Sequence, residues 1–372
     1  MVIWLAHTKE LLDQAYETFT NVWSHIGSED VITYKMWDKF DLPEQDELYD
    51  GFVFCGIQKL MSIAKNDVNK FKNIVDSCVL VIVDEAHRAS ASESKKAINE
   101  LMSKPFGAVD RALIGLTATP GRSSINQEEN LLFASMFENK IIGINTKLLN
   151  DLNLSETEAA NAEPESDIIR YFQDRKILAN IKREKIEYGE LTGDEIKSLT
   201  VHLTANGYKD YSEAFIKKIS FNKLRNQKIL DRLIELNSTD TPTIVFACSV
   251  EHGKMLSAAL TLQGIENGHV FGNMDAIERR QTIKRFKDKN DKLNILINYE
   301  VLTTGFDATN IKCVFITRPT HSVVLYSQML GRGLRGPQMG GNAECLLIDI
   351  EDNLSRYTSE SSAFNSFDSY WK

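Results

Sequence analysis

The amino-acid sequence predicts an α/β protein with two domains, each built on a parallel sheet covered by helices. Three observations support this class. Short apolar runs alternate with amphipathic stretches along most of the 372 residues. The runs carry Val, Ile and Leu at consecutive positions, as in strands that are buried on both faces. They form two series, which an acidic, polar stretch at 151–168 separates.

Each series contains four or five expected strands with helices between them. In the first series we expect strands at 2–6, 51–55, 78–83 and 112–116, and helices at 11–23 and 93–102. In the second we expect strands at 243–246, 268–271, 293–297, 313–316 and 345–350, and helices at 252–263, 276–286 and 323–331. Residues 170–185 and 208–237, which are mixed in charge, are expected to be helices packed on the second domain.

These elements predict four parts of the chain. Residues 1–145 form a partial first domain, and 146–190 form an acidic linker or helical joint. Residues 191–355 form the second domain, and 356–372 form a carboxyl-terminal tail. At roughly 150 residues per domain the length alone allows two large domains or three small ones, so the two series decide for two.

Composition excludes several classes of protein. The net charge of −9 argues against a protein that is basic all over, although a local basic groove can still bind nucleic acid. Such grooves could use the basic residues at 279–289 or 176–185, or these residues could form solvated faces. The five cysteines stand singly in or beside apolar runs, which favours reduced, buried thiols. The longest apolar run is far shorter than a membrane span, and the start lacks a signal-peptide pattern, so we expect a cytoplasmic protein without a membrane partner.

Two segments place polar groups directly after a buried strand. The segment CVLVIVDEAH ends in two adjacent carboxylates, Asp84 and Glu85, at the edge of a parallel sheet where ligands bind. Two acids at such an edge suit a Mg²⁺–nucleotide site, but a cap at the end of the strand explains them equally well. The segment GLTATP brings Thr117 and Thr119 to the same kind of edge, and a simple polar turn before Pro120 is the alternative.

A third segment, QMLGRGLR, carries two arginines near a predicted helix end. Arg332 and Arg335 are three residues apart, about one helical turn, so both guanidiniums can point the same way. Paired arginines suit a polyphosphate because each offers a planar fork of donors and a permanent charge. Taken alone, the segment could equally be a solvated basic helix end.

The order of these motifs resembles a known family. DEAH at 84–87, TAT at 117–119, TTGFD at 303–307 and QxxGRxxR at 328–335 occur in one chain in the order of the superfamily 2 helicases and translocases, DEAH type. VIVDEAHRA with GLTATPGR looks like the branch of restriction-enzyme motor subunits and excision-repair-type DNA helicases. The resemblance runs from about Ala6 to Asp352. It implies two RecA-like domains of the P-loop NTPase class, the first truncated at its amino end, with ATP and Mg²⁺ as cofactors.

The resemblance implies a role for each motif residue. Asp84 would bind Mg²⁺ through water and Glu85 would activate the hydrolytic water, so both count as metal-site residues. His87 and Gln328 would sense the nucleotide, and Thr117 and Thr119 would couple hydrolysis to movement. Gly305 and Asp307 would meet the nucleotide from the second domain, and Arg332 and Arg335 would act as arginine fingers. The residues expected near a nucleic-acid strand are Thr8, Gly56, Gln58, Ser249, His252, Thr303 and Thr304.

One motif of the family is absent from the sequence. No GxxxxGK[ST] phosphate loop occurs, and the only Gly-Lys pair, Gly253-Lys254, is followed by Met255. In the family this loop precedes the segment LAHTKELLDQ at 5–14, so a strand–loop–helix unit of about 30 residues is missing. Three explanations stay open: a truncated chain or split gene, a partner subunit that supplies the unit, or a non-catalytic relative.

The sequence therefore predicts a nucleic-acid-dependent ATPase, a helicase or a double-stranded DNA translocase, impaired as an isolated chain. DNA is preferred over RNA only because of the branch that the motifs resemble. The alternative is a non-catalytic nucleic-acid-binding or scaffold subunit of a larger complex. The dispersed histidines and the absence of HExxH give no support to a zinc hydrolase.

Overall fold

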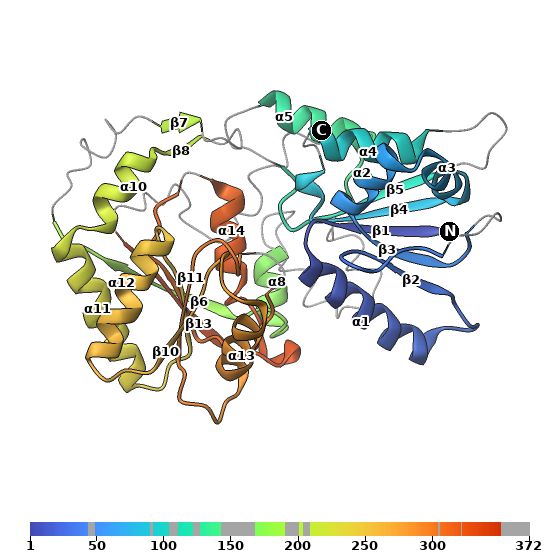
Figure 1. Cartoon of the computed structure of the whole chain (residues 1–372). Helices are drawn as coiled ribbons and strands as arrows, with labels where there is room; N and C mark the ends of the chain where they lie inside the picture. Colours follow the sequence, from blue (N-terminus) through green and yellow to red (C-terminus); the bar gives the residue numbers. More distant parts are fainter. Residues whose placement is uncertain are drawn as a thin grey trace, which may run out of the picture. The chain divides into compact units, whose positions relative to one another are not determined.

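The computed structural model describes residues 1–43, 49–89, 92–103, 111–121, 127–142, 168–189, 201–203, 209–303, 306–320 and 322–350. The described residues belong to two compact units, one within Met1–Ile141 and one within Ile142–Ser366. Each unit contains one parallel sheet with helices on its faces, which confirms the predicted α/β class (Figure 1).

The first unit is built on a five-stranded sheet in which all neighbours are parallel, in the order β2-β3-β1-β4-β5. Its strands are β1 (Val2–Ala6), β2 (Thr33–Met36), β3 (Phe52–Gly56), β4 (Leu80–Asp84) and β5 (Ala112–Leu116). Its helices are α1 (Lys9–Ile26), α2 (Ile57–Asn66), α3 (Val68–Ser77), the short η1 (Ala86–Arg88), α4 (Ser92–Met102) and α5 (Gln127–Met136).

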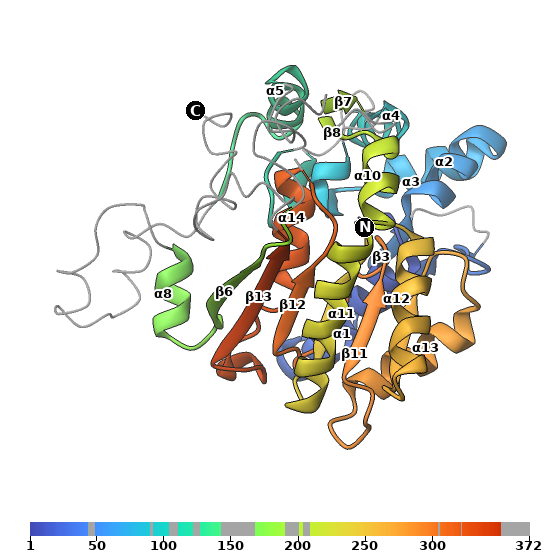
Figure 2. The same cartoon turned by 90° about the vertical axis from the view of Figure 1, so that its left-hand side faces the viewer.

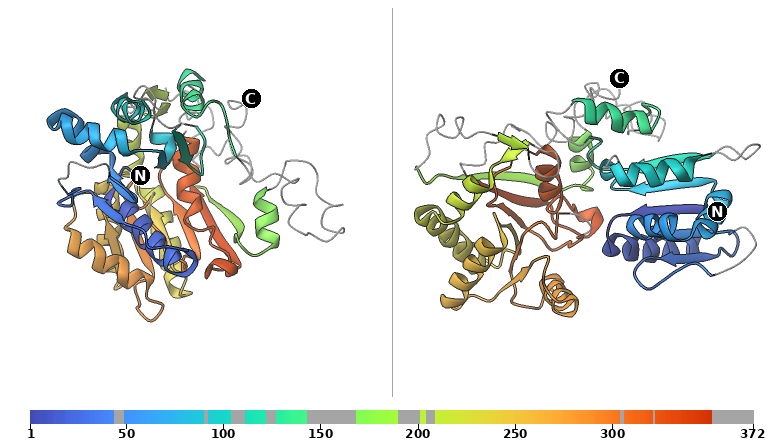
Figure 3. Two further views of the ribbon diagram at one scale, coloured as in Figure 1. Left: turned by 90° about the vertical axis from the view of Figure 1, so that its right-hand side faces the viewer. Right: turned by 45° about the horizontal axis from the view of Figure 1, so that its top comes forward.

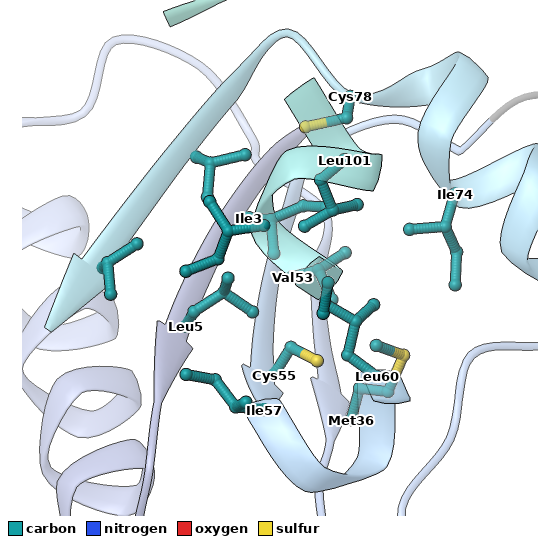
Figure 4. Close-up of a cluster of buried hydrophobic side chains, with 14 of the residues drawn as sticks. Ile3, Leu5, Met36, Val53, Cys55, Ile57, Leu60, Ile74, Cys78 and Leu101 are labelled. Atoms are coloured by element: carbon teal, nitrogen blue, oxygen red, sulfur yellow. The ribbon is translucent and has the colours of Figure 1, made fainter. Parts of the chain in front are cut away.

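Alternating side chains divide the first unit into two cores. One face of the sheet contributes Ile3, Leu5, Val53 and Cys55, which pack with residues of α2, α3 and α4 such as Leu60, Ile74 and Leu101 (Figure 4). The other face contributes Trp4, Phe52 and Phe54, which pack against Leu12 and Phe19 of α1. Figure 3 shows this helix, in dark blue, along the sheet. Both cores form because side chains on a strand alternate between faces.

The second unit is built on a six-stranded parallel sheet in the order β10-β11-β9-β12-β13-β6. Figure 2 shows β6, β13 and β12 side by side in this sheet. Its strands are β6 (Asn180–Ile186), β9 (Thr243–Phe246), β10 (Asn267–Val270), β11 (Ile295–Asn298), β12 (Cys313–Ile316) and β13 (Glu344–Ile350). An antiparallel pair, β7 (Val201–Leu203) and β8 (Lys209–Tyr211), lies outside this sheet. The helices are α8 (Ile168–Asp174), α10 (Glu213–Ser220), α11 (Lys223–Ser238), α12 (Val250–Leu262), α13 (Ala276–Lys287), α14 (Val323–Gly331) and the short η2 (Pro337–Met339).

The expected strands occur within two residues of their predicted ends, and β1, β5, β9 and β12 coincide with the prediction. One expectation is wrong: residues 170–185 are not one helix, because β6 begins at Asn180 and pairs with β13 along its length. Residues 209–211 are likewise a strand, and β2 was not expected at all. The acidic stretch at 151–167 and the tail at 356–372 lie outside the described residues.

In the part of the chain that the structure describes, no helix is both long and apolar enough to cross a membrane.

Candidate active site

The acidic pair stands at the carboxyl end of β4, as the sequence predicts. Asp84 is the last residue of the strand, and its Oδ1 accepts a hydrogen bond from the Glu85 backbone N–H at 2.9 Å. Burial raises the pKa of the Asp84 carboxyl above its ordinary value. Glu85 takes the left-handed conformation, with φ of 49°, which non-glycine residues rarely adopt. The chain therefore turns sharply at Glu85, directly after the strand.

His87 connects this acidic pair to the end of the neighbouring strand. The His87 side chain is 2% exposed, and its Nδ1 lies 3.3 Å from Glu85 Oε2 and 3.1 Å from Thr117 Oγ1. Thr117 follows β5, which pairs with β4, so the DEAH and TAT segments meet at one edge of the sheet. The structure thus brings Glu85, His87 and Thr117 together, as their positions after adjacent parallel strands require.

The Thr117 hydroxyl forms hydrogen bonds within its own segment. The Thr117 hydroxyl donates to the Thr119 carbonyl oxygen at 3.0 Å, and it accepts the Thr119 backbone N–H at 3.1 Å. The same hydroxyl lies within hydrogen-bond distance of His87 Nδ1, so Thr117 joins His87 to the Thr119 backbone. Thr119 is buried at 1% exposure, so it contributes through its backbone. A movement at Thr117 would consequently reach His87 and Glu85.

The donor set fits Mg²⁺ better than a transition metal. Among the described residues, no group of three or more His, Cys, Asp or Glu side chains could hold a metal ion. Asp84 and Glu85 supply hard carboxylate oxygens, and Mg²⁺ usually binds one or two such groups while keeping waters and substrate phosphates as its other ligands. The two acids therefore fit an ion that arrives with a nucleotide.

The residues of the first unit that were expected near nucleic acid have local structural roles. Thr8 is the amino-terminal cap of α1, and its hydroxyl accepts the Leu11 backbone N–H at 3.4 Å. Gly56 is buried at the end of β3, and Gln58 is exposed in the first turn of α2. All three follow the carboxyl ends of β1 and β3, at the same edge of the sheet as Asp84.

His7 follows β1 at this edge of the sheet, and the sequence did not predict a role for it. Burial, together with the nearby Arg88 charge, lowers the pKa of His7 to about 4. Its Nε2 is buried and has no hydrogen-bond partner among the described residues. The only signal in the sequence is a histidine directly after a predicted strand, which is too common to indicate a role.

In the second unit the two arginines converge on one segment. The Arg332 Nη1 donates to the Phe306 carbonyl oxygen, and Arg335 Nε lies 2.9 Å from Asp307 Oδ1. The expectation that both arginines lie on one turn of a helix is wrong, because α14 ends at Gly331 and Arg335 lies beyond it. Thr304 and Gly305 lie outside the described residues.

Two further motif residues of the second unit, Gln328 and Thr303, lie near the arginines or near the Phe306–Asp307 segment. Arg332 Nε donates to the carbonyl oxygen of the half-buried Gln328 at 3.2 Å. Thr303 is 5% exposed and donates its hydroxyl to the Glu300 carbonyl oxygen. The structure therefore brings the TTGFD and QxxGRxxR motifs together within the second unit.

The expectation that His252 contacts nucleic acid is wrong for its side chain, which is fully buried. His252 Nδ1 accepts the Cys248 backbone N–H, and Nε2 faces Asn226 Oδ1, each at 3.1 Å. Burial, together with the charge of Arg225, lowers the pKa of His252 to about 3. Ser249, by contrast, is half-buried and caps α12 by accepting the His252 backbone N–H at 3.1 Å.

The basic group at 279–289 is partly used inside the protein. Arg285 pairs with Glu266 and Asp291, and these carboxylates raise its pKa. Arg279 donates to the carbonyl oxygens of Phe271 and Gly272. Of this group, Arg280, Lys284, Arg285, Lys287 and Lys289 are exposed. The contacts of Arg279 and Arg285 therefore engage two of the six basic side chains within the second unit.

Family models match both units. Residues 1–122 match the family described as "Type III restriction enzyme, res subunit", and residues 225–336 match the "Helicase conserved C-terminal domain". The first match includes the edge of the sheet with Asp84, Glu85 and Thr117, and the second includes Asp307, Arg332 and Arg335.

Two curated proteins are similar in sequence. A Schizosaccharomyces pombe protein named as a candidate mitochondrial ATP-dependent helicase, irc3, is 40% identical over 123 residues, which cover 33% of this chain and 20% of that protein. A Saccharomyces cerevisiae protein named as a candidate ATP-dependent helicase, IRC3, is 25% identical over 332 residues, which cover 89% of this chain and 40% of that protein. The chain thus spans less than half the length of either relative.

A solved structure confirms the fold. A fragment of a candidate HsdR subunit of a type I restriction enzyme from Vibrio vulnificus superposes with a TM-score of 0.58 at 17% identity. The match covers 98% of this chain and 55% of that one. The two parallel sheets therefore match RecA-like helicase domains, as the sequence predicted.

Proposed function

We propose, from the membership of this chain in the superfamily 2 helicases and translocases, that it is part of a motor that couples ATP hydrolysis to movement along DNA. The observation that carries the proposal is the cluster at the ends of β4 and β5. There Glu85 and Thr117 both lie within 3.3 Å of the same nitrogen of His87, and Asp84 precedes them on the strand. His87 thereby connects Glu85, which would act on ATP, to Thr117 of the TAT segment, which would couple hydrolysis to movement.

The residues of the chain have separate tasks in this proposal. Asp84 would hold Mg²⁺ through water, and Glu85 would orient the attacking water and accept its proton. Bound ATP·Mg²⁺ supplies the phosphoanhydride bond and a cation that neutralises phosphate charge. His87 and Gln328 sense the nucleotide, and Thr117 and Thr119 couple its hydrolysis to movement. Gly305 and Asp307 contact the nucleotide from the second unit.

The two arginines are proposed to act as arginine fingers. Arg332 and Arg335 are held by the Phe306–Asp307 segment, so their guanidiniums are positioned before any phosphate arrives. A preorganised cation of this kind stabilises the charge that develops on the transferred phosphoryl group.

DNA is the proposed substrate because the matched family of the first unit is described by a restriction enzyme. Thr8, Gly56, Gln58, Ser249, Thr303 and Thr304 are the proposed positions near the strand. His252 belongs to this set only as the support of Ser249, since its own side chain is buried. The five cysteines are buried free thiols, which supports a reducing compartment such as the cytoplasm.

The absence of a GxxxxGK[ST] motif from these 372 residues limits the activity that we expect. That loop supplies backbone N–H donors and a lysine to the phosphates. We therefore expect weak or absent ATP turnover from the 372-residue chain. A partner subunit or an upstream segment is the proposed source of the loop. The same absence supports the second candidate, a non-catalytic nucleic-acid-binding subunit.

The first experiment compares ATP hydrolysis and DNA binding by the purified chain. When a phosphate loop is provided, the motor proposal expects that ATP·Mg²⁺ changes the DNA affinity, measured by fluorescence anisotropy, and that Arg332→Ala removes this change. Once a phosphate loop is provided, Glu85→Gln lowers DNA-stimulated hydrolysis roughly 10²–10⁴-fold, because the general base is lost.

Glu128→Gln is the matched control, since Glu128 is an exposed glutamate of the same unit and lies on α5. It leaves hydrolysis unchanged. With the phosphate loop provided, DNA binding that ignores ATP·Mg²⁺ and is equal in wild type, Glu85→Gln and Arg332→Ala would establish the non-catalytic candidate instead. Normal motor rates from the 372-residue chain would refute our view that the loop is needed from outside it.

A further inference from the structure

The break between helices α10 and α11 exposes two large apolar side chains. Phe221 caps the end of α10 and is 55% exposed, more than any other described phenylalanine, and Leu224 in the first turn of α11 is 43% exposed. Neither belongs to a core cluster, and the Phe221 ring meets no aromatic or cationic partner among the described residues. We call residues 217–228, which span this break, the α10–α11 corner (Figure 1).

Four exposed lysines lie within four residues of Phe221 or Leu224 along the chain. They are Lys217, Lys218, Lys223 and Lys228. In the part of the chain that the structure describes, none of the four forms an ion pair or a hydrogen bond through its ammonium group. Arg232 on the same helix α11, by contrast, pairs with Glu184 and Glu235. The corner therefore combines an exposed aromatic ring with a group of positive charges.

A buried polar network fixes the corner to the second sheet. Arg225 is fully buried, and its Nη2 donates to the Thr317 carbonyl oxygen directly after β12. Asn226 Nδ2 donates to the Ser220 carbonyl oxygen at 2.8 Å, and Asn226 Oδ1 lies 3.1 Å from His252 Nε2 in the first turn of α12. A buried charge that loses its partners is costly, so this network holds the first turn of α11 in place. The corner is thus preorganised near the carboxyl ends of β9 and β12.

The corner adjoins Ser249, which is a proposed position near nucleic acid. The buried side of α10 packs on Cys248, the residue directly before Ser249. Hydrogen bonds from its own backbone N–H and from Ser249 lower the pKa of Glu251 in the first turn of α12, and the nearby Lys217 charge lowers it further. Lys217 therefore lies close to the start of α12.

The basic residues at the end of α13 lie at the opposite edge of the second sheet. Helix α13 begins after the carboxyl end of β10 and ends before the amino end of β11, so its last turn is at the amino edge. There the Phe286 carbonyl oxygen accepts a hydrogen bond from Asn310, which precedes β12. Lys284 and Lys289 are exposed in this region. They match two lysines of the corner in charge but lie at the edge opposite Ser249.

An exposed aromatic ring with flanking lysines has the chemistry that binds single-stranded nucleic acid. Lysines bind the phosphates, and the ring stacks on a base, whatever the sequence. In a duplex the bases already stack on one another, so such a ring meets a free base face only where a base is unpaired. Phe221 and Leu224 lie outside both segments that match the family models.

We propose that the α10–α11 corner binds single-stranded nucleic acid, with an unpaired base stacked on Phe221 and the flanking phosphates bound by the four lysines of the corner. Leu224 packs against the same nucleotide. The proposal rests on the proposed function only in taking nucleic acid as the substrate, and ATP plays no part in the contact. The buried network around Arg225 keeps the ring in place before the strand arrives.

The first test measures binding of a fluorescein-labelled oligothymidylate to the 372-residue chain, without ATP, by fluorescence anisotropy. Phe221→Ala lowers the affinity roughly 5- to 100-fold, because the stacking of one base is lost, and Phe221→Trp keeps it within about twofold. Leu262→Ala is the matched control for loss of an exposed apolar side chain, since Leu262 is 87% exposed at the end of α12. It leaves the affinity unchanged. No binding of oligothymidylate, or equal binding by wild type and Phe221→Ala, overturns the proposal.

An oligonucleotide of the same length without bases separates stacking from a structural role of Phe221. Wild type and Phe221→Ala bind this abasic sugar–phosphate chain equally, because it offers no base to the ring. An equal loss of affinity on the two oligonucleotides would show that Phe221→Ala disturbs the corner rather than a base contact. An equal loss on a blunt duplex would show that an unpaired base is not what the ring meets. Either result overturns the stacking contact.

The salt dependence of binding tests the lysines. Each phosphate contact to a single strand contributes roughly 0.7 to the slope of log affinity against log salt concentration, so Lys218→Gln with Lys223→Gln reduces the slope by about 1.4. Lys284→Gln with Lys289→Gln removes the same charge from the same unit and changes the slope by less than about 0.3. Equal reductions by the two double variants would show that the corner is not the phosphate contact.

Two results separate this proposal from others. Polyglutamate that displaces oligothymidylate, and that binds Phe221→Ala more weakly than wild type, would make an acidic protein segment the occupant and overturn it. The same titrations are repeated with ATP·Mg²⁺ on a chain provided with a phosphate loop. Binding that depends on Phe221 but ignores ATP·Mg²⁺ supports the corner and refutes the proposed motor. An affinity that ATP·Mg²⁺ changes but Phe221→Ala does not change does the reverse.

Discussion

The two sheets of the molecule are built from the same kind of strand but are covered to different degrees. In the second unit every residue of β9, β11 and β12 is buried, because helices cover both faces. In the first unit β4 alternates between buried and half-buried residues, and β5 alternates between half-buried and exposed ones. The second sheet also ends in the charged strand β6, whereas the first ends in the apolar β5.

The less covered strands of the first sheet are also those that position its candidate site. The poorly covered strands are the two that carry Asp84 and Thr117 at their ends, while β1 and β3 are covered on both faces. Among the described residues, the least covered strands of the first sheet are thus the two that position the candidate site.

The largest expected effect comes from shortening the same residue in the two sheets. Ile316 of β12 is fully buried, so Ile316→Ala removes apolar contacts and leaves a cavity, at a cost of about 2–5 kcal/mol. Ile114 of β5 is 44% exposed, so Ile114→Ala costs less than about 1 kcal/mol. Urea unfolding, followed by hydrogen exchange in each unit, measures the two free energies. Equal losses would show that the two sheets are covered alike and would break the comparison.

The strands that the sequence predicted are those with consecutive apolar residues. That signal located β4, β9 and β12. It therefore also located Asp84, at the end of β4, and Ser249, in the segment that follows β9. It missed β6, because NIKREKI is an edge strand whose exposed positions are charged, and its apolar residues, Ile181 and Ile186, do not alternate. Pairing of β6 with β13 is a contact between residues far apart in the chain, which no local pattern reveals.

The sequence predicted the residues of the candidate site that stand directly at or after the end of a strand, such as Asp84 and Thr117. Contacts between distant segments were not predicted, such as Arg335 with Asp307 or His87 with Thr117. The burial of His252 could have been predicted, since it lies four residues before Leu256 and eight before Leu260, on the buried side of α12. The exposed face of β5 could not, because coverage depends on which helices lie over it.

The second prediction compares the two buried histidines as pH falls. Burial lowers the pKa of His252 to about 3 and that of His7 to about 4, from about 6.5 in an unfolded chain. The folded state therefore binds fewer protons than the unfolded state, so stability is complete above pH 6.5 and decreases as pH falls toward these values. At pH 5 the second unit loses about 2 kcal/mol through His252, at about 1.4 kcal/mol per pH unit.

Urea unfolding at pH 7 and pH 5 measures this loss. His252→Gln keeps an acceptor for Cys248 and a donor for Asn226, so it lowers stability at pH 7 but makes the second unit less sensitive to pH. His25→Gln is the control, since His25 is exposed on α1. An unchanged pH dependence in His252→Gln would show that His252 is not the group that titrates.

The smallest expected effect separates a helix cap from a nucleic-acid contact. Ser249 caps α12 at 3.1 Å and Thr8 caps α1 at 3.4 Å, so Ser249→Ala costs about 1 kcal/mol and Thr8→Ala a few tenths. Ser249→Asp keeps the cap, because a carboxylate accepts the same N–H, but its charge repels phosphate. If Ser249 faces a strand, Ser249→Asp lowers DNA affinity in an anisotropy titration without loss of stability. An affinity equal to that of wild type would leave Ser249 with the cap alone.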